Sequence, residues 1–502
     1  MVKSAYSYHV FILPFLLKGI NKGAITTKLT RQNWERIQVM GELPYLREDE
    51  TIHYAHHFYF NKEAKELIHS PVVEGKETDE FSYLVENYIY KPTSEKEYYY
   101  RISYFASDAV ATSSLHFFDL KVDYILLRYL PDLDMAYLVF SLENHTYTSL
   151  KEVGYINQYG RRIFTPFLNE NVTYSEAPNN LQLLEKNQLS HAPEESDYLK
   201  TYNIMDAPRE LLMDFFQLSK EAIFPQCPQD MSIYLDTIID DRMFVHSLIG
   251  NQQLESLIQA ASEVENLSTQ QMQDLYSLAF VDKDAATCRS KSMLQSILEQ
   301  TVYPRWAEYK SLYLVTQHSF IYLSDGQQPL FLTQYFLSEY LDMVLIVLSQ
   351  RTGILKYSHD AGNNVRSSVG SILKLQENYI IFKNQFLLPE ISAQEQAIDL
   401  YHLLQNALYI EKYSDLLDSQ LSSLHDISQT KEAIRQKKND DDLNYIVLFL
   451  TGVSLLPILP LEHVLWKQVS FLGDIKLIHL FSIITMILFG IIFYIRKKIL
   501  SR

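Results

Sequence analysis

The stretch IRQKKNDDDLNYIVLFLTGVSLLPILPLEHVLW, Ile434–Trp466, decides how this chain is organised. A basic cluster runs into three successive aspartates, and the sequence then turns apolar over residues 443–461. A second apolar segment follows at residues 475–495. Each segment approaches the roughly 20 residues that an α-helix needs to cross about 30 Å of hydrocarbon. We therefore predict two transmembrane helices; the alternative is a buried helical hairpin in a soluble core.

The distribution of lysine and arginine predicts the orientation of the two spans. Positive residues are enriched at the cytoplasmic ends of membrane helices. Here they precede the first span and follow the second, whereas the connecting loop 462–474 holds only Lys467. Both termini, including the basic tail 496–502, are thus expected on the cytoplasmic side of the cell's inner (plasma) membrane. The basic residues are Lys431, Arg435, Lys437 and Lys438 before the first span, and Arg496, Lys497, Lys498 and Arg502 after the second.

Polar residues recur along the first span. Asn444, Thr451 and Ser454 follow one helical face, and Ile458 and Glu462 continue it to the outer end. Polar groups that face lipid cost free energy, so this face is expected to meet another helix or water. In a symmetric ring of subunits it would line a central pore. The alternative is a packing face of small polar side chains in an ordinary membrane anchor.

Asp440, Asp441 and Asp442 stand at the cytoplasmic start of this span. Repeated around a ring of subunits, they would place carboxylates at the mouth of the pore, and such acidic rings concentrate cations. In a monomeric protein the same aspartates would mark only a solvated helix boundary.

The residues before the membrane, 391–442, contain neither proline nor glycine. Good helix formers dominate, which predicts a long stalk helix of roughly 70 Å at about 1.5 Å per residue. Its apolar residues follow a 4-3 rhythm, as in helices that pack along another helix. We interpret this stripe as the seam of a bundled stalk; the alternative is a core-facing stripe within one subunit. The stripe comprises Leu403, Ala407, Ile410, Leu417, Leu421 and Leu424, with Ser414 and Ser428 at two of its positions.

Composition limits the classes of protein that fit. With 502 residues, 47% of them hydrophobic, the chain is long enough for a large folded core. The formal net charge of -17 argues against binding to DNA or RNA, because phosphate polyanions would be repelled. Only 14 glycines occur, and the two commonest glycine-rich phosphate-binding loops are missing. Cys227 and Cys288 are too few for a disulfide framework, and they suit a reducing cytosol.

The first 390 residues are expected to form an α+β cytoplasmic domain with an α/β/α-like arrangement of layers. A β-rich part, 1–184, precedes a polar boundary at 185–199 and an α/β part at 200–390. The predicted strands are YSYHVFILPF, HHFYFN, YYYRISYFA, a hairpin of VDYILLRYL and AYLVFSLEN around the turn PDLD, a hairpin or strand pair within Ser232–Ile249, and Ser311–Gly326. The predicted helices are NQQLESLIQAASEVENL, SKSMLQSILEQTVY and the buried QYFLSEYLDMVLIVLSQRTGILKYSH.

No catalytic constellation stands out, so no enzymatic activity is expected. His53, His56 and His57 occur together, but the aromatic residues around them predict a strand whose histidines face different sides, which disfavours a metal site. Arg161 and Arg162 are suited to hold a phosphate in this acidic protein. The alternative for the two arginines is a solvated loop.

The layout resembles the CorA family of divalent-cation channels. The shared features are an intracellular α/β domain, a very long helix that runs into the first span, a short outer loop, a second span and a basic tail. The resemblance implies a homopentamer whose first spans line the pore, with magnesium (Mg2+) as the conducted ion. One departure concerns the outer end of the first span, where the family's Gly-Met-Asn signature forms the selectivity ring. Here the region reads PLEHVLW, with Glu462 and His463 as the only replacements, so magnesium selectivity is in doubt.

Four local strings narrow the resemblance to the CorA-like membrane effectors of type III CRISPR systems. They are HVFILPF (9–15), INQYGRRIFTPFL (156–168), DDRMFVHS (240–247) and EISAQEQAIDLY (390–401). This resemblance implies antiviral defence, in which a nucleotide second messenger binds the cytoplasmic domain and opens or disrupts the membrane pore. The messenger would be an S-adenosylmethionine–AMP conjugate or a cyclic oligoadenylate, held through Arg161, Arg162 and Arg242.

Two other functions fit the same sequence. One is a constitutive transporter of divalent cations, and the other is a membrane-tethered binding or scaffold protein without conductance. Magnesium uptake that needs no messenger would indicate the first. A monomer that tolerates a foreign two-span anchor would indicate the second.

Overall fold

The computed structural model describes residues 6–18, 34–46, 50–70, 84–91, 97–105, 115–162, 167–168, 174–175, 180–186, 189, 234–237, 242–282, 286–455 and 484. The second predicted span, the outer loop and the basic tail lie outside these residues, except for the single position 484. The chain divides into two compact units, which are Met1–Asn363 with Leu375–Gln420, and Asn364–Lys374 with Leu421–Arg502.

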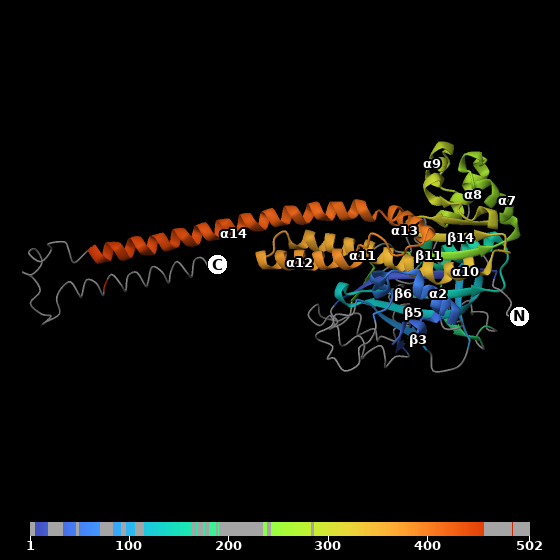
Figure 1. Cartoon of the computed structure of the whole chain (residues 1–502), viewed down its shortest axis with the longest axis horizontal. Helices are drawn as coiled ribbons and strands as arrows, with labels where there is room; N and C mark the ends of the chain where they lie inside the picture. The colour runs from blue at the N-terminus through green and yellow to red at the C-terminus, as the bar shows by residue number, and fades with distance from the viewer. Residues whose placement is uncertain are drawn as a thin grey trace, which may run out of the picture. The chain divides into compact units, whose positions relative to one another are not determined.

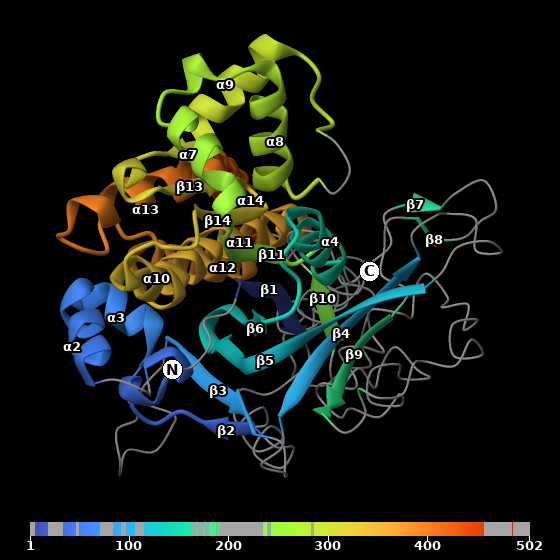
Figure 2. The ribbon, with the colours of Figure 1, turned by 90° about the vertical axis from the view of Figure 1, so that its right-hand side faces the viewer.

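A large, mainly antiparallel sheet forms the first unit (Figure 2). Within the described residues it has 12 strands in the order β12-β13-β14-β11-β1-β6-β5-β3-β2, with β10 paired to β1 and β4 paired to β5 and β9. Strands β11 and β14 pair in parallel. The strands are β1 (Ser7–Lys18), β2 (Trp34–Arg36), β3 (Glu86–Tyr90), β4 (Tyr98–Phe105), β5 (Leu115–Leu130), β6 (Met135–Asn144), β9 (Asn180–Glu185), β10 (Tyr234–Thr237), β11 (Phe244–Gly250), β12 (Val302–Tyr303), β13 (Ser311–Val315) and β14 (Ser319–Ser324); β7 (Phe167–Leu168) and β8 (Tyr174–Ser175) form a separate pair.

Strand β1 joins the two predicted parts of the domain in one sheet. It pairs with β6 on one side and with β11 on the other, so residues from 1–184 and from 200–390 share hydrogen-bonded strands. The predicted hairpin is confirmed as β5 and β6, and its turn ends at Asp134 with a left-handed φ of 50°. The hairpin interpretation of Ser232–Ile249 is wrong, because β10 and β11 each pair with β1 and not with each other.

Helices cover both faces of the sheet, as the alternation of side chains along β14 requires. Ile321 and Leu323 belong to a core cluster that includes residues of α7, α8 and α9. Phe320 and Tyr322 point the other way, with rings 5.2 and 5.4 Å from that of Phe336 on α10. Figure 2 shows β13 and β14 between these two groups of helices. The helices are α2 (Glu50–Tyr59), α3 (Lys62–Ile68), α4 (Leu150–Gly160), α7 (Glu255–Ala261), α8 (Thr269–Phe280), α9 (Lys291–Thr301), α10 (Leu330–Leu337), α11 (Glu339–Asn364), α12 (Val369–Phe386), α13 (Glu395–Ala407) and α14 (Ile410–Leu455). The mixed α+β class predicted from the sequence is therefore confirmed.

Helix α11 is a buried core helix. Glu339 and Asp342 are 1% and 0% exposed, and the apolar residues between 341 and 348 are all buried. Within the described residues, one helical stretch, 330–364, is long and apolar enough to cross a membrane, but 67% of its most apolar window is buried inside the protein. Its length and composition therefore suit a core helix as well as a membrane helix.

The segment HHFYFN, predicted as a strand, belongs to α2 and its end. His56, Tyr59 and Phe60 are buried while Tyr54 and Phe58 are exposed, a spacing of three to four residues that fits a helix and not a strand. The alternation of aromatic and histidine residues was therefore a misleading signal.

The predicted single stalk helix is two helices, α13 and α14. They are separated at Tyr409, which adopts a left-handed φ of 56° although no glycine or proline marks the break. Helix α14 then continues without interruption through the predicted membrane boundary at residues 442–443 to Leu455 (Figure 1). Its 46 residues span about 70 Å.

The apolar stripe of the stalk is buried within the single chain along α14, while Leu403 and Ala407 on α13 are only half-buried. From residue 410 onward its members are at most 9% exposed, including both serines. The alternative interpretation, a core-facing stripe within one subunit, is therefore the one that the structure supports here. These residues are Ile410, Ser414, Leu417, Leu421, Leu424 and Ser428.

Candidate functional site

The end of α14 carries the residues predicted to line a pore. Asn444 and Thr451 are both exposed and lie seven residues apart, close to two helical turns. The Thr451 hydroxyl donates to the carbonyl oxygen of Val447 at 2.8 Å, which satisfies the hydroxyl locally. Ser454 lies in the same helix, whereas Ile458 and Glu462 are outside the described residues. The described part of the predicted face is thus helical, and among the described residues its Asn444 and Thr451 side chains are exposed.

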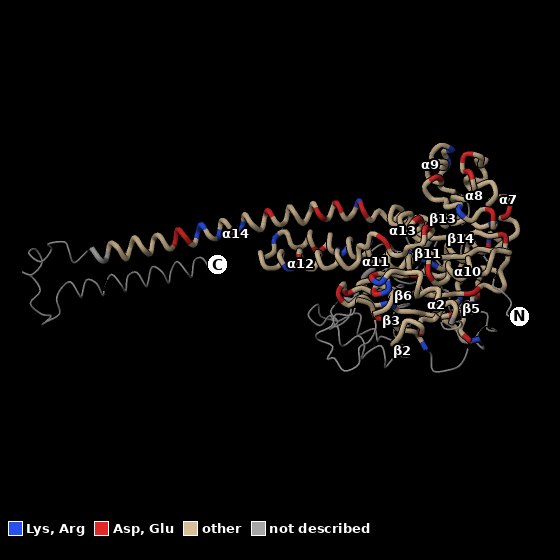
Figure 3. The backbone as a smooth tube through the Cα atoms, in the orientation of Figure 1, with Lys and Arg blue, Asp and Glu red and all other residues tan. Residues whose placement is uncertain are grey.

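The apolar side chains of this segment are exposed as well. Exposed apolar side chains around most of the circumference of a helix are typical of a membrane span, because water would penalise such a surface. Figure 3 shows that the charged residues of α14 end before this last, uncharged part. The exposed apolar residues, between 58% and 75% accessible, are Leu443, Tyr445, Val447, Leu448 and Leu450.

Helical geometry separates the three aspartates at 440–442. Successive residues of an α-helix turn by about 100°, so three neighbours cannot all point toward one axis. Asp440 precedes Asn444 by four residues and shares its face, whereas Asp442 lies on nearly the opposite side and is half-buried. A ring of carboxylates around a central axis would therefore be formed by Asp440, with Asp441 at its flank.

The arginines predicted to hold a phosphate come together in the structure. Arg162 and Arg242 form an isolated antiparallel bridge, and the amide nitrogen of Met243 donates to the carbonyl oxygen of Arg161 at 2.8 Å. The end of α4 is thereby fixed beside the start of β11. Arg161 and Arg162 are 1% and 5% exposed, so the alternative of a solvated loop is wrong for both.

Arg161 is already engaged with protein oxygens. Its Nη2 lies 3.2 Å from Oε1 of Gln158 and 3.4 and 3.3 Å from the carbonyl oxygens of Phe280 and Val281. These contacts tie α4 to the end of α8, where Val281 has a left-handed φ of 59° and leaves helical carbonyls without helical partners. Arg161 therefore serves the fold.

A buried polar cluster joins three of the four strings that carry the family resemblance. His9 Nδ1 lies 2.7 Å from Oδ1 of Asn157 and 3.2 Å from Oγ of Ser247, and His9 Nε2 lies 2.8 Å from Oγ of Ser7. Burial lowers the pKa of His9 to about 4, although the bond to Asn157 opposes this shift. His9 is therefore a neutral core histidine, and the cluster positions β1, α4 and β11 next to the arginines.

The fourth string is anchored through its own contacts. Asn61, the N-cap of α3, donates through Nδ2 to the carbonyl oxygen of Glu390 at 2.7 Å. Glu395 and Asp399 of α13 both accept from the guanidinium of Arg305, at 3.0 and 2.9 Å. These residues fix the start of α13 to the domain and are too exposed to suggest a catalytic pair.

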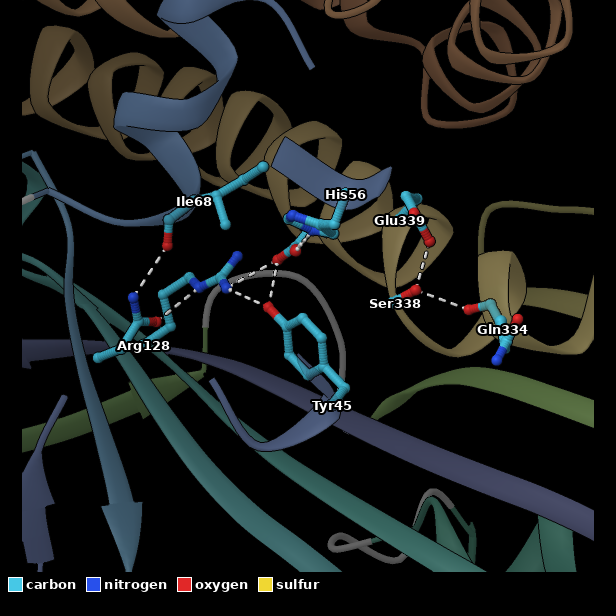
Figure 4. A network of polar contacts seen from close by, with 9 residues as sticks. Tyr45, His56, Ile68, Arg128, Gln334, Ser338 and Glu339 are labelled. Atoms are coloured by element: carbon cyan, nitrogen blue, oxygen red, sulfur yellow. Dashed lines mark hydrogen bonds and ion pairs between the residues drawn. The ribbon is translucent and has the colours of Figure 1, made fainter. Parts of the chain in front are cut away.

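A second buried network, centred on Asp342, was not foreseen from the sequence (Figure 4). Asp342 accepts from Arg128 Nη2 at 2.8 Å, from the Tyr45 hydroxyl at 2.7 Å and from His56 Nε2 at 2.8 Å. Burial opposes ionisation of Asp342, yet Arg128 and the bond from His56 hold its pKa below the ordinary value. No sequence pattern links these residues, because 214 positions separate Arg128 from Asp342.

The network continues from Arg128 across the sheet. Arg128 Nε donates to Oδ1 of Asn87 at 2.9 Å, and Asn87 Nδ2 donates to the carbonyl oxygen of Ile68 at 2.9 Å. The ionised pair of this network, Arg128 and Asp342, is 1% and 0% exposed. It links α2, α3, β3, β5 and α11 and is suited to holding the fold, not to chemistry on a substrate.

The three neighbouring histidines do not form a metal site. His56 is buried and used in the Asp342 network, while His53 is half-buried and His57 is exposed. Over the described ranges, no group of at least three histidine, cysteine or acidic side chains is placed to hold a metal ion.

Comparison with protein-family models, with curated proteins and with solved structures finds no match to this chain. The interpretation of its function therefore rests on its own residues: an anion-suited arginine pair in the domain and an exposed apolar helix with a polar face.

Proposed function

We propose that this chain is the subunit of a homo-oligomeric membrane channel whose cytoplasmic domain is regulated by a nucleotide messenger. The first span lines the conducting path, and the second span and basic tail return the chain to the cytoplasm. Binding of the messenger to the domain shifts the equilibrium toward an open or membrane-disrupting state, which requires tighter binding to that state than to the closed one. The family resemblance supplies antiviral defence as the biological setting.

The observation that carries this proposal is the continuity of α14. One helix holds a buried stripe at its domain end, a charged segment in its middle and exposed apolar turns at its far end. A rigid helix of this kind can transmit a displacement of the domain to the membrane, because its hydrogen bonds are all internal. Asn444 and Thr451 then place hydrogen-bonding groups where an ion would pass.

The ligand part of the proposal is supported by Arg162 and Arg242. Guanidinium groups form bidentate, charge-assisted hydrogen bonds with phosphate, and such bonds contribute about 1.5–3 kcal/mol each. The two arginines lie between the end of α4 and the start of β11, so a ligand bound there would contact the chain at both places. An S-adenosylmethionine–AMP conjugate or a cyclic oligoadenylate carries the required phosphates.

Flux through reconstituted liposomes tests the proposal. Full-length protein is expected to release potassium or magnesium ions only when one of the two messenger types is added. Asn444→Leu and Thr451→Val are expected to change the flux several-fold, because they remove polar groups from the conducting face. Ile446→Val, on the opposite face, is the matched control and should leave the flux unchanged.

The ligand site is tested separately. Arg162→Gln or Arg242→Gln is expected to raise the messenger concentration for half-maximal flux by about tenfold or more, the effect of losing one charge-assisted contact. If ions pass without any messenger, the protein is a constitutive divalent-cation transporter and not a regulated channel.

One observation favours a second candidate, a membrane-tethered binding protein without conductance. The stalk stripe is buried within the single chain and so does not by itself call for other subunits. A monomer in detergent that conducts no ions under any messenger would establish this alternative.

A further inference from the structure

We propose that the face of α14 carrying Ile427 and Ile434 packs against a second copy of the chain, side by side and in the same direction. This inference rests on the proposed homo-oligomer and assigns the surface that holds its stalk together. It concerns a face of the helix that is distinct from the buried stripe and from the face of Asn444.

Ile427 and Ile434 are the only large apolar residues between Leu424 and Leu443. They are 40% and 64% exposed, which is unusual for isoleucine on an otherwise polar helix. Their separation of seven residues places them on one face, and Tyr445, eleven residues further on and 63% exposed, continues it. The three residues form a narrow apolar line that begins below the membrane and runs into it.

This line is separated from the surface that the chain itself covers. Leu421, Leu424 and Ser428 are buried, and they are centred about a quarter of the circumference away from Ile427. Lys431, near the buried side, donates to the carbonyl oxygens of Val365 and Ser367 in the turn before α12. The chain thus packs on one side of α14 and leaves the isoleucine side open among the described residues.

The charges around the line favour a parallel copy. Lys437 and Lys438 precede Asp440, Asp441 and Asp442 by about one turn, which is about 5.4 Å along the axis. In a parallel neighbour at the same height, each lysine can reach the aspartates one turn above it on the adjacent helix. Such pairs between helices set orientation and offset the repulsion of aspartates that come together. In an antiparallel pair the membrane segments of the two helices would lie at opposite ends of the pair and could not enter the same membrane.

Lipid is excluded as the occupant at Ile427. This residue precedes the start of the predicted span by sixteen positions, or about 24 Å of helix, which places it well below the hydrocarbon. A small molecule is disfavoured because the line is narrow and lies on a convex helix surface, unlike the concave sites that bind ligands.

Site-specific photocrosslinking of the full chain in membranes tests the inference. Benzoylphenylalanine replaces Ile434 in one variant and Gln436, which is exposed on the opposite side of the helix, in the control. On illumination, the fraction of chains that form a species of twice the chain mass is expected to be at least about fivefold higher for the Ile434 variant than for the control. The reason is that the two positions lie on opposite faces of the helix. Mass spectrometry should locate the attachment on α14 of the second copy.

A product within one chain, or equal dimer formation from both positions, would overturn the inference. Ile427→Ser combined with Ile434→Ser supplies a second readout: it should weaken self-association by about tenfold or more, while Gln429→Ser with Gln436→Ser should not. The number of subunits in the unmodified protein distinguishes failure of the proposed channel from failure of this interface alone. A monomer refutes the proposed channel itself, whereas a conducting oligomer with crosslinks elsewhere refutes only this interface.

Discussion

Charged side chains are used in opposite ways in two regions of this molecule. Around Asp342 the charges are buried, and the ion pair with Arg128 has both partners at 1% exposure or less. In residues 431–442 of α14 the same kinds of side chain are almost all exposed. Buried charges are costly unless every one is compensated, so the first region fixes one internal arrangement. The exposed charges are available to solvent, to lipid head groups or to another copy.

The largest effect that separates the two regions is expected from Asp342→Asn. The substitution leaves the Arg128 guanidinium buried without its counter-charge, which typically costs about 3–5 kcal/mol of folding free energy. Chemical denaturation of the detergent-solubilised protein measures this loss. The same change at exposed Asp440 is the matched control and should leave the midpoint unmoved. A stable Asp342→Asn protein would show that the pair is not needed for the fold.

A somewhat smaller effect is expected from the buried histidines. The pKa of His9 falls from 6.5 to about 4 on burial, so between these values the unfolded chain binds a proton that the folded chain does not. The stability that this histidine contributes is therefore complete above pH 6.5 and is lost as the pH falls toward 4, by about 3 kcal/mol in total. His246, whose pKa burial lowers to about 3, acts in the same direction.

His9→Gln tests this dependence. The variant is expected to start from a lower stability at pH 7 but to lose less of it on acidification, because one titrating group is gone. Thermal unfolding at a series of pH values gives the slope, and exposed His402→Gln serves as control. An unchanged slope in His9→Gln would mean that acid sensitivity arises elsewhere.

The sequence predicted those elements whose own residues carry the signal. Strand β1 and the β5–β6 hairpin follow from apolar, aromatic runs and a Pro-Asp turn. Helix α2 was missed because its aromatic and histidine residues alternate locally, while its burial repeats every three to four residues. The break at Tyr409 was missed because the left-handed residue there is a tyrosine, so neither a glycine nor a proline marks it.

Sites were predicted only in part, for a physical reason. Arg162 and Arg242 could be named individually as candidate phosphate contacts, and the structure joins them in an isolated antiparallel bridge between the end of α4 and the start of β11. The Asp342 network depends on a contact between residues 214 positions apart, and no local pattern encodes such a pairing. The three aspartates point to different faces simply because successive residues of a helix are turned by about 100°. The predicted ring of all three did not take this rotation into account.

The smallest effect on stability is expected at Lys431, a lysine of α14 whose charged group bonds within the chain. Lys431 Nζ donates to the carbonyl oxygens of Val365 and Ser367 at 3.2 and 3.3 Å, which satisfies backbone acceptors between α11 and α12. Lys431→Met keeps the aliphatic stem and removes both bonds, so a local cost of about 1 kcal/mol is expected.

Amide hydrogen exchange in residues 365–372 measures this cost as faster exchange of the turn, by about fivefold for each 1 kcal/mol of local opening free energy. Lys437→Met, on an exposed lysine of the same helix, should leave the exchange rates unchanged. Equal acceleration in both variants would indicate that lysine charge acts on the helix as a whole. In that case Lys431 belongs with the exposed charges of α14 and not with the internally satisfied ones.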